Sequence, residues 1–235
     1  MKRIVLSLLA VFFAAGSISA QLDTVAVMKI HTNSAMIGII VAWDSISPDD
    51  EVEANGIKMP NDFPEFVSVH TDSLIVITAN VPIRALISDG YGMVELDITR
   101  CPSLKYLNCE NNSLLTLNIS NNPELEQLIV SGNSLNVLDL SSAALLKTLQ
   151  CSNNELTTLD LSMNPKLEKI TCKHNQLTEL DLSKNLLLKE IDCQNNQLSA
   201  LDISTNTNLT KLYAIALFLA RPTTRPRSSK TTAST

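Results

Sequence analysis

The chain has 235 residues, enough for one or two domains, and 45% of them are hydrophobic while only 4% are aromatic. Its apolar content is therefore mainly aliphatic, which suits thin, regular layers better than one large irregular core. The 24 acidic residues outnumber the 18 basic ones, and six of the basic ones lie in residues 1–20 and 214–235, which contain no Asp or Glu. Such an acidic body disfavours nucleic acids and anionic membranes as partners, because both bind through positive protein charge.

Residues 1–20 have the pattern of a signal peptide. Lys2 and Arg3 provide the positive start, residues 4–15 form an apolar run, and small residues at 16–20 precede an expected cleavage before Gln21. The alternative is a transmembrane anchor, but a bilayer span needs about 20 apolar residues and this run is shorter. We therefore expect an exported protein, secreted, periplasmic or on the cell surface, with no membrane span in the mature chain.

Residues 21–74 are predicted to form a small β unit that caps the N-terminal end of the repeats that follow. Short β-prone stretches at 24–30, 36–43, 51–54 and 66–70 alternate with turn-forming sequences such as Asn55-Gly56. A cap is expected because the open end of a stack of repeats exposes apolar surface and unpaired strand edges. A carbohydrate-binding role for this unit is an alternative without specific support in the sequence.

The strongest signal is a repeat of 21 residues that covers residues 75–213 without an insertion. Residues 75–95 form a degenerate first turn, in which Ile77, Ile83, Leu86 and Met93 keep the apolar positions but Tyr91 replaces an Asn. We call each set of residues spaced by 21 a column. Further apolar columns begin at Leu96, Ile98 and Leu114, and the two clearest columns are Leu104, Leu125, Leu146, Leu167, Leu188 and Leu209, and Leu107, Leu128, Leu149, Ile170, Ile191 and Leu212.

The spacing within each turn predicts the fold. Leu107 and Cys109 are separated by one residue, so both side chains point to the same side of an extended segment. The same segment recurs in every turn and is predicted to stack as a parallel ladder with strands about 4.8 Å apart. One turn can bury its apolar side only against its neighbours, so the predicted fold is a solenoid whose stability is a sum of stacked contacts.

Two polar columns are predicted to have structural roles. An inward Asn amide can donate to and accept from backbone groups that lack sheet partners where the chain curves after the strand; a ligand site is the alternative. The acidic column precedes Ser or Thr by two residues, as in Asx turns; a calcium-binding ladder is the alternative. The Asn column is Asn112, Asn133, Asn154, Asn175 and Asn196, and the acidic column is Asp97, Asp139, Asp160, Asp181 and Asp202, with Asn118 replacing one Asp.

The consensus L-x-x-L-x-C-x-x-N-x-L-x-x-L-D-L-S-x-N-P resembles the leucine-rich-repeat family and is most similar to the cysteine-ladder repeats of internalin-J-like bacterial surface proteins. Cys109, Cys151, Cys172 and Cys193 match the ladder cysteines, whereas Val130 departs from the pattern. The Asn column matches the asparagine ladder of the family. The resemblance implies a right-handed solenoid with parallel strands on the concave face, irregular or extended convex segments, and a role in binding proteins or host surfaces.

No sequence pattern typical of catalysis is present. We find no nucleophile–base pair, phosphate-binding loop or zinc-binding spacing, and we expect no catalytic residue, metal or cofactor. His174 occupies a strand-end position and is expected to be exposed. The ladder cysteines are expected to be buried free thiols, because parallel neighbouring side chains have poor disulfide geometry, although disulfides are an alternative in an exported chain. Cys101, on the opposite loop, is expected to be exposed.

The outward strand positions vary from turn to turn, whereas the inward columns stay constant. Packing does not require these outward residues, so they are predicted to bind a partner; a merely solvated polar face is the alternative. Tyr106 and Ile129 are the most apolar of them and are the first candidate anchors. The predicted partner-binding residues are Tyr106, Asn108, Glu110, Gln127, Ile129, Ser131, Thr148, Gln150, Lys169, Thr171, Lys173, Glu190 and Asp192, with Ser152 and Gln194 at equivalent positions.

A separate outward column, immediately before the strands, alternates in charge from turn to turn. Alternation of this kind predicts ion pairs between neighbouring turns, each of which contributes little at a surface. The column consists of Lys105, Glu126, Lys147, Glu168 and Lys189.

Residues 214–235 depart from the repeat and are predicted to be a disordered basic tail. The sixth turn starts with Leu201, Leu209 and Leu212, but Ala214 stands where a Cys is expected. A shift of one base could convert the Ala214 codon into a Cys codon. We therefore hypothesise that a frameshift replaced later repeats with unrelated residues.

Together these features predict an exported protein that binds another protein through its concave face, with adhesion to host or neighbouring cells as the expected use. The sequence does not identify the partner, and it favours neither nucleic acid nor a membrane. The alternatives are a passive structural or envelope protein without a specific ligand, a truncated non-functional fragment of a longer adhesin and, with least support, a hydrolase.

Overall fold

The computed structural model describes the backbones of the strands between residues 26 and 79 and, with side chains, residues 83–90 and 92–214. The predicted signal peptide at 1–20 and the tail beyond Ala214 lie outside the described residues. Every regular element in the described part is a β-strand. None of the described residues forms a helix long and apolar enough to cross a membrane.

The strands fall into three groups along the chain. The N-terminal group is β1 (Ala26–Thr32), β2 (Ile37–Trp43), β3 (Val52–Ala54), β4 (Ile57–Lys58), β5 (Glu65–Val69) and β6 (Leu74–Ala79). A first irregular turn contains β7 (Ile83–Ile87) and β8 (Met93–Asp97). The regular turns each contribute one three-residue strand, namely β9 (Tyr106–Asn108), β10 (Gln127–Ile129), β11 (Thr148–Gln150), β12 (Lys169–Thr171), β13 (Glu190–Asp192) and β14 (Lys211–Tyr213).

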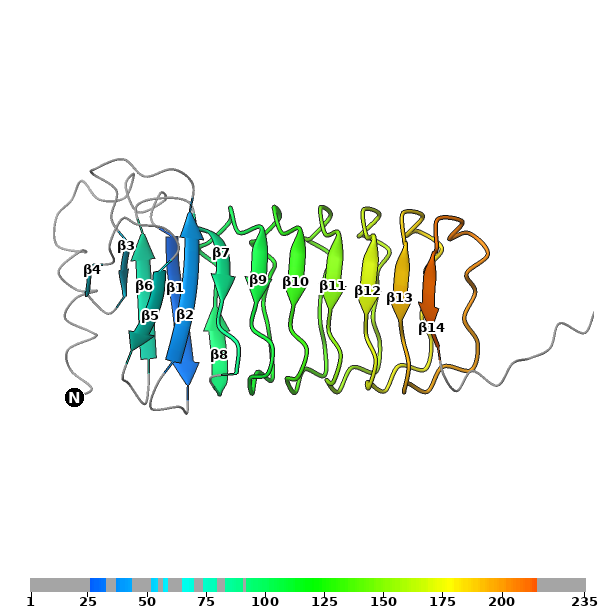
Figure 1. Ribbon diagram of the computed structural model, residues 1–235, viewed down its shortest axis with the longest axis horizontal. Coiled ribbons are helices and arrows are strands. Elements are labelled where there is room, and N and C mark those ends of the chain that lie inside the picture. The colour runs from blue at the N-terminus through cyan, green and yellow to red at the C-terminus, as the bar shows by residue number, and fades with distance from the viewer. Residues whose placement is uncertain are drawn as a thin grey trace, which may run out of the picture.

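These strands form two sheets, and one of them extends along the whole molecule (Figure 1). The nine-stranded sheet has the order β14-β13-β12-β11-β10-β9-β7-β2-β5, and the five-stranded sheet has the order β4-β3-β6-β1-β8. Pairing is parallel from β7 through β14 and antiparallel where β2 and β5 join. The N-terminal strands β2 and β5 therefore continue the sheet beyond β7, and the assignment of residues 21–74 as a cap stays a prediction.

The N-terminal region contains more pairing than the sequence indicated. The stretches expected at 24–30, 36–43, 51–54 and 66–70 correspond to β1, β2, β3 and β5, whereas β4 and β6 were not expected. Strand β1 pairs antiparallel with both β6 and β8, and β2 pairs antiparallel with β7. Because pairing crosses residue 74, the predicted boundary there remains a prediction.

The repeat sets the register of the parallel ladder. Leu128 lies opposite Leu107 on one side and Leu149 on the other, and Ile170 opposite Leu149 and Ile191, so each residue pairs with one 21 positions away. The degenerate first turn keeps this register, because Leu86 pairs with Leu107. The predicted parallel solenoid is thereby confirmed.

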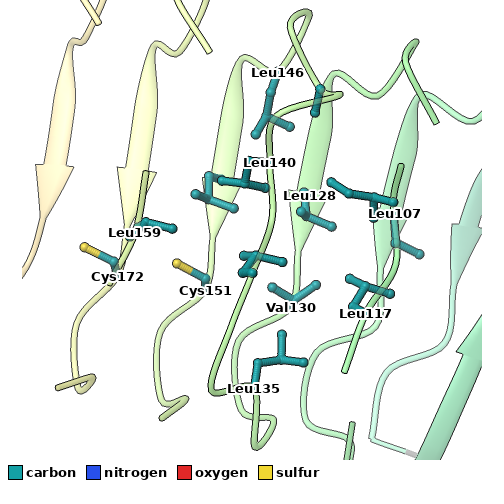
Figure 2. Close-up of a cluster of buried hydrophobic side chains, with 14 of the residues drawn as sticks. Leu107, Leu117, Leu128, Val130, Leu135, Leu140, Leu146, Cys151, Leu159 and Cys172 are labelled. Carbon is teal, nitrogen blue, oxygen red and sulfur yellow. The ribbon is translucent and has the colours of Figure 1, made fainter. Parts of the chain in front are cut away.

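The inward columns make one continuous core along the solenoid (Figure 2). Leu107, Leu128 and Leu149 are completely buried, and the side chains of Cys151 and Cys172 lie in the same interior. Each fully buried Leu contributes roughly 1.5–3 kcal/mol relative to an exposed one. Leu212 is the member of this column in the last described turn. It is 41% exposed, because the described residues cover this turn from one side only.

Candidate binding face

The outward side chains of β7 and β9–β14, and of the residues just after each of these strands, form one surface, which we call the strand face. Tyr106 pairs in register with Gln127, and Asn108 with Ile129, so outward side chains form columns parallel to those of the core. Backbone pairing continues beyond the short strands, since Asn111 N donates to Ser131 O at 2.8 Å. This pairing holds the strand face rigid from turn to turn.

All thirteen residues predicted to bind a partner have accessible side chains on the strand face. Gln127 is exposed and the others are half-buried. The equivalent position at Ser152 is an exception, because only 4% of this residue is exposed. The expectation that Ser152 points into solvent is wrong, and its Oγ is buried without a hydrogen-bond partner among the described residues. The structure brings the thirteen residues together without testing what they bind.

Charges in the C-terminal half of the strand face pair with one another. Lys169 Nζ lies 3.2 Å from Glu190 Oε1, and Lys211 Nζ lies 3.2 Å from Glu190 Oε2. The pKa of Glu190 is lowered, chiefly by the hydrogen bond from Lys169. Lys173 Nζ lies 4.0 Å from Asp192 Oδ2. The sequence did not lead us to expect these pairs, although the 21-residue spacing of Glu190 from Lys169 and Lys211 in a parallel ladder would have indicated two of them.

The alternating column before the strands forms ion pairs as predicted, in two places. Lys147 Nζ lies 2.6 Å from Glu126 Oε2, and Lys189 Nζ lies 2.6 Å from Glu168 Oε2. The hydrogen bond from each Lys lowers the pKa of the paired carboxyl. Both pairs are largely exposed, so neither contributes much to stability.

At the N-terminal end of the strand face, Asp89 and Glu110 occupy equivalent positions in consecutive turns. Gly90 N donates to Glu110 O at 3.0 Å, which holds the two segments side by side. The pKa of Glu110 is raised, first by partial burial and then by repulsion from Asp89. No ion pair to either carboxylate is found among residues 83–90 and 92–214.

The Asn column has the predicted structural role. Asn133 Nδ2 donates to Cys109 O and Val130 O at 3.0 Å each, and Asn133 Oδ1 accepts from Leu114 N at 3.0 Å. The same bonds recur at Asn154, Asn175 and Asn196. Each amide therefore joins the backbone of consecutive turns and leaves none of its polar atoms available to a ligand.

The structure contains a second ladder of buried amides, which was not predicted from the sequence. Asn164 Nδ2 donates to Leu140 O at 3.0 Å and to Ala143 O at 2.9 Å, and its Oδ1 has no partner among the described residues. The Asn that precedes Pro in the repeat consensus could have indicated this ladder. Its column is interrupted by Cys101 and Ala143, which hides the period. Its Asn members are Asn122, Asn164, Asn185 and Asn206.

The residue just before each Asn of the first column has a left-handed backbone. His174 has φ 54°, and it is exposed as predicted, with Nε2 3.1 Å from Asn195 Nδ2. Gly132 has φ 68° at the equivalent position, and an added Cβ would lie 2.6 Å from Asn111 Oδ1. These residues close the turn rather than form a reactive site.

All five cysteines are free and buried. Burial raises the pKa of Cys109 and Cys151 to about 12, so these thiols stay protonated at neutral pH. The expectation that Cys101 is exposed is wrong, because only 1% of it is exposed. Cys101 occupies the inward column of the second amide ladder, where a small apolar side chain packs well.

The acidic column forms the expected Asx turns. Asp160 Oδ1 accepts from Ser162 N at 2.9 Å, and this hydrogen bond is the main cause of the lowered pKa of Asp160. Equivalent bonds occur at Asp139, Asp181 and Asp202. Within the described part of the chain, no three His, Cys, Asp or Glu side chains gather closely enough to hold a metal ion.

Comparison with solved structures supports the resemblance inferred from the repeats. The functional domain of InlJ from Listeria monocytogenes, whose title names a cysteine ladder, aligns with 33% identity and a TM-score of 0.52. This chain therefore folds as a leucine-rich-repeat solenoid. The alignment covers 53% of this chain and 28% of the InlJ chain, so this chain matches less than a third of the length of InlJ.

Two further solved structures also align with about half of this chain. LIC12759 of Leptospira interrogans aligns with 24% identity over 50% of this chain and 32% of its own, with a TM-score of 0.48. The internalin InlF of Listeria monocytogenes aligns with 22% identity over 51% of this chain and 39% of its own, with a TM-score of 0.47. No protein-family model and no curated protein matches the chain.

Proposed function

We propose that this chain is an exported leucine-rich-repeat protein that binds another protein through the strand face and mediates adhesion to host or neighbouring cells. In this proposal residues 1–20 direct export, residues 21–74 cap the solenoid, and residues 75–213 present the binding surface. The main support for this proposal is the contrast between the inward and the outward columns. Inward columns are uniform and buried, whereas Tyr106, Ile129 and the other outward residues vary in type and remain accessible.

The strand face is suited to protein recognition because its backbone is hydrogen-bonded from turn to turn and it presents an apolar patch near its N-terminal end beside polar side chains. Tyr106 and Ile129 lie on neighbouring strands, and aromatic and aliphatic side chains of this kind are the usual energetic anchors of interfaces. Hydroxyl and amide side chains, such as those of Thr148 and Gln150, surround them. Catalysis is not part of the proposal.

The test is cell binding by the double variant Tyr106→Asp/Ile129→Asp. Adding two charges to this apolar patch is expected to weaken binding at least tenfold, because each charge would have to be desolvated in the interface. Flow cytometry of the labelled full chain on candidate host and bacterial cells measures this, and prior protease treatment of the cells shows whether the receptor is a protein. Circular dichroism checks that the variant is folded.

The matched control is Val137→Asp/Thr158→Asp, which adds two charges at exposed positions away from the strand face. This variant is expected to bind like the unaltered chain. If the unaltered chain binds no cells, or if both double variants lose binding equally, the adhesion proposal is wrong. The first of these results favours a passive structural protein, which the internal ion pairing of Lys169, Glu190 and Lys211 would suit.

A further inference from the structure

The two ends of the strand face differ in how their charges are satisfied. Toward the C-terminus, Glu190 receives both Lys169 and Lys211, and Asp192 faces Lys173. A partner would gain little from charges that already neutralise one another. Among the described residues just after the strands at the N-terminal end, Asp89 and Glu110 are both acidic, so this end is where a partner of opposite charge would gain most.

The carboxylates of Asp89 and Glu110 carry this difference. They belong to consecutive turns, and their backbones are hydrogen-bonded to each other through Gly90 N and Glu110 O. The single side-chain partner of Asp89 in the described structure is the neutral amide of Asn111, whose Nδ2 lies 3.1 Å from Asp89 Oδ1. Neither carboxylate has an ion pair within residues 83–90 and 92–214, so the two repel each other, and a cation placed between them would relieve that repulsion.

Apolar side chains lie directly beside this acidic pair. Ile87 and Ile129 both pair with Asn108, one from each neighbouring strand, and all three side chains share one outward column. Asn108 Oδ1 accepts from Glu110 N at 3.0 Å, so its amide is turned toward its own backbone. Tyr106 lies in the adjacent outward column, and its hydroxyl has no hydrogen-bond partner among residues 83–90 and 92–214.

We propose that these five residues, Ile87, Asp89, Tyr106, Glu110 and Ile129, form an acidic–apolar corner that binds a partner-protein segment with a Lys or Arg beside an aliphatic or aromatic residue. The proposal rests on the proposed function and specifies the partner's chemistry. The cation pairs with Asp89 and Glu110, the apolar side chain covers Ile87 and Ile129, and Tyr106 packs against the stem of the cation.

Selection of short peptides on the immobilised full chain tests this inference. A display library of random 12-residue peptides supplies the probes, and the enriched peptides are synthesised and their Kd values measured by fluorescence polarisation. We expect enrichment of peptides in which Lys or Arg lies within two positions of an apolar residue. Their binding is expected to weaken at least tenfold in Asp89→Asn/Glu110→Gln, which removes charge with little change in shape, and to weaken with rising salt.

The matched control is Glu190→Gln, which removes one carboxylate from the paired half of the same face. It is expected to leave the Kd of these peptides within about twofold. Enriched peptides that are acidic, or that respond to Glu190→Gln and not to Asp89→Asn/Glu110→Gln, would overturn the acidic–apolar corner while leaving strand-face binding intact. A library that yields no enriched peptide also overturns the inference, whereas the proposed function is then decided separately by the cell-binding experiment.

Discussion

Replacing Asn154 with Ala is expected to lower the free energy of unfolding by about 3–6 kcal/mol, one of the two largest effects of a single substitution in this chain. Asn154 Nδ2 donates to Val130 O at 3.0 Å, to Cys151 O at 3.2 Å and to Ser152 O at 3.3 Å, and its Oδ1 accepts from Leu135 N at 3.0 Å. An Ala leaves Leu135 N without a partner, and each of the three carbonyls loses one of two hydrogen bonds, keeping those from Asn133, Asn175 and Gly132. The unpartnered amide costs about 1–3 kcal/mol and each lost hydrogen bond about 0.5–1.5 kcal/mol, and urea denaturation measures the total.

Two other Asn variants make this prediction specific. Asn164→Ala is expected to cost less, about 1–3 kcal/mol, because Asn164 makes only two hydrogen bonds and its unpartnered Oδ1 is removed with the side chain. The chain itself carries Ala143 at the equivalent position of the preceding turn. Asn136→Ala, at an exposed position, is expected to change stability by less than about 0.5 kcal/mol. Equal losses for Asn154→Ala and Asn136→Ala would contradict the structural role of the first amide ladder.

The second large effect is expected for Leu149→Ala, at about 2–5 kcal/mol of lost stability. Leu149 is completely buried and is covered on both sides, by Leu128 and Ile170. A cavity in the middle of the stack weakens contacts with both neighbouring turns, because the stability of a solenoid depends on nearest-neighbour interfaces. Urea denaturation followed by circular dichroism gives the free energy.

The same substitution at Leu212 provides the comparison within one column. Leu212 is 41% exposed in the last described turn, so Leu212→Ala is expected to cost only about 1 kcal/mol. The ratio of the two losses measures how much burial depends on position along the stack. A loss at Leu149 no larger than the loss at Leu212 would show that the interior turns are not packed against each other as described.

The repeat portion of this fold is predictable from the sequence because its rules are local. A period of 21 residues with one residue between Leu107 and Cys109 fixes both the direction of the side chains and the parallel register. The strand face follows from the same alternation, which is why thirteen accessible residues could be named in advance. Ser152 departs from the prediction because alternation predicts the direction of a side chain and not how deeply it is buried.

Other features of the fold depend on contacts that produce no repeating pattern in the sequence. The pairing of β1 with both β6 and β8 joins segments distant in sequence, and short antiparallel strands carry no marker of which strand they pair with. The second amide ladder is interrupted by Cys101 and Ala143, so its period is hidden. The one-sign charge near Asp89 becomes evident only when the pairing of the other charges on the face is known.

The central claim is that residues 21 positions apart stack directly on one another. Methyl–methyl nuclear Overhauser contacts in the selectively labelled full chain test it most directly. Leu128 and Leu149 are expected to show a cross-peak, as are Leu149 and Ile170, whereas Leu128 and Ile170, two turns apart, are expected to show none. Absence of the 21-residue cross-peaks, or contacts without this period, would contradict the solenoid and every assignment made on its strand face.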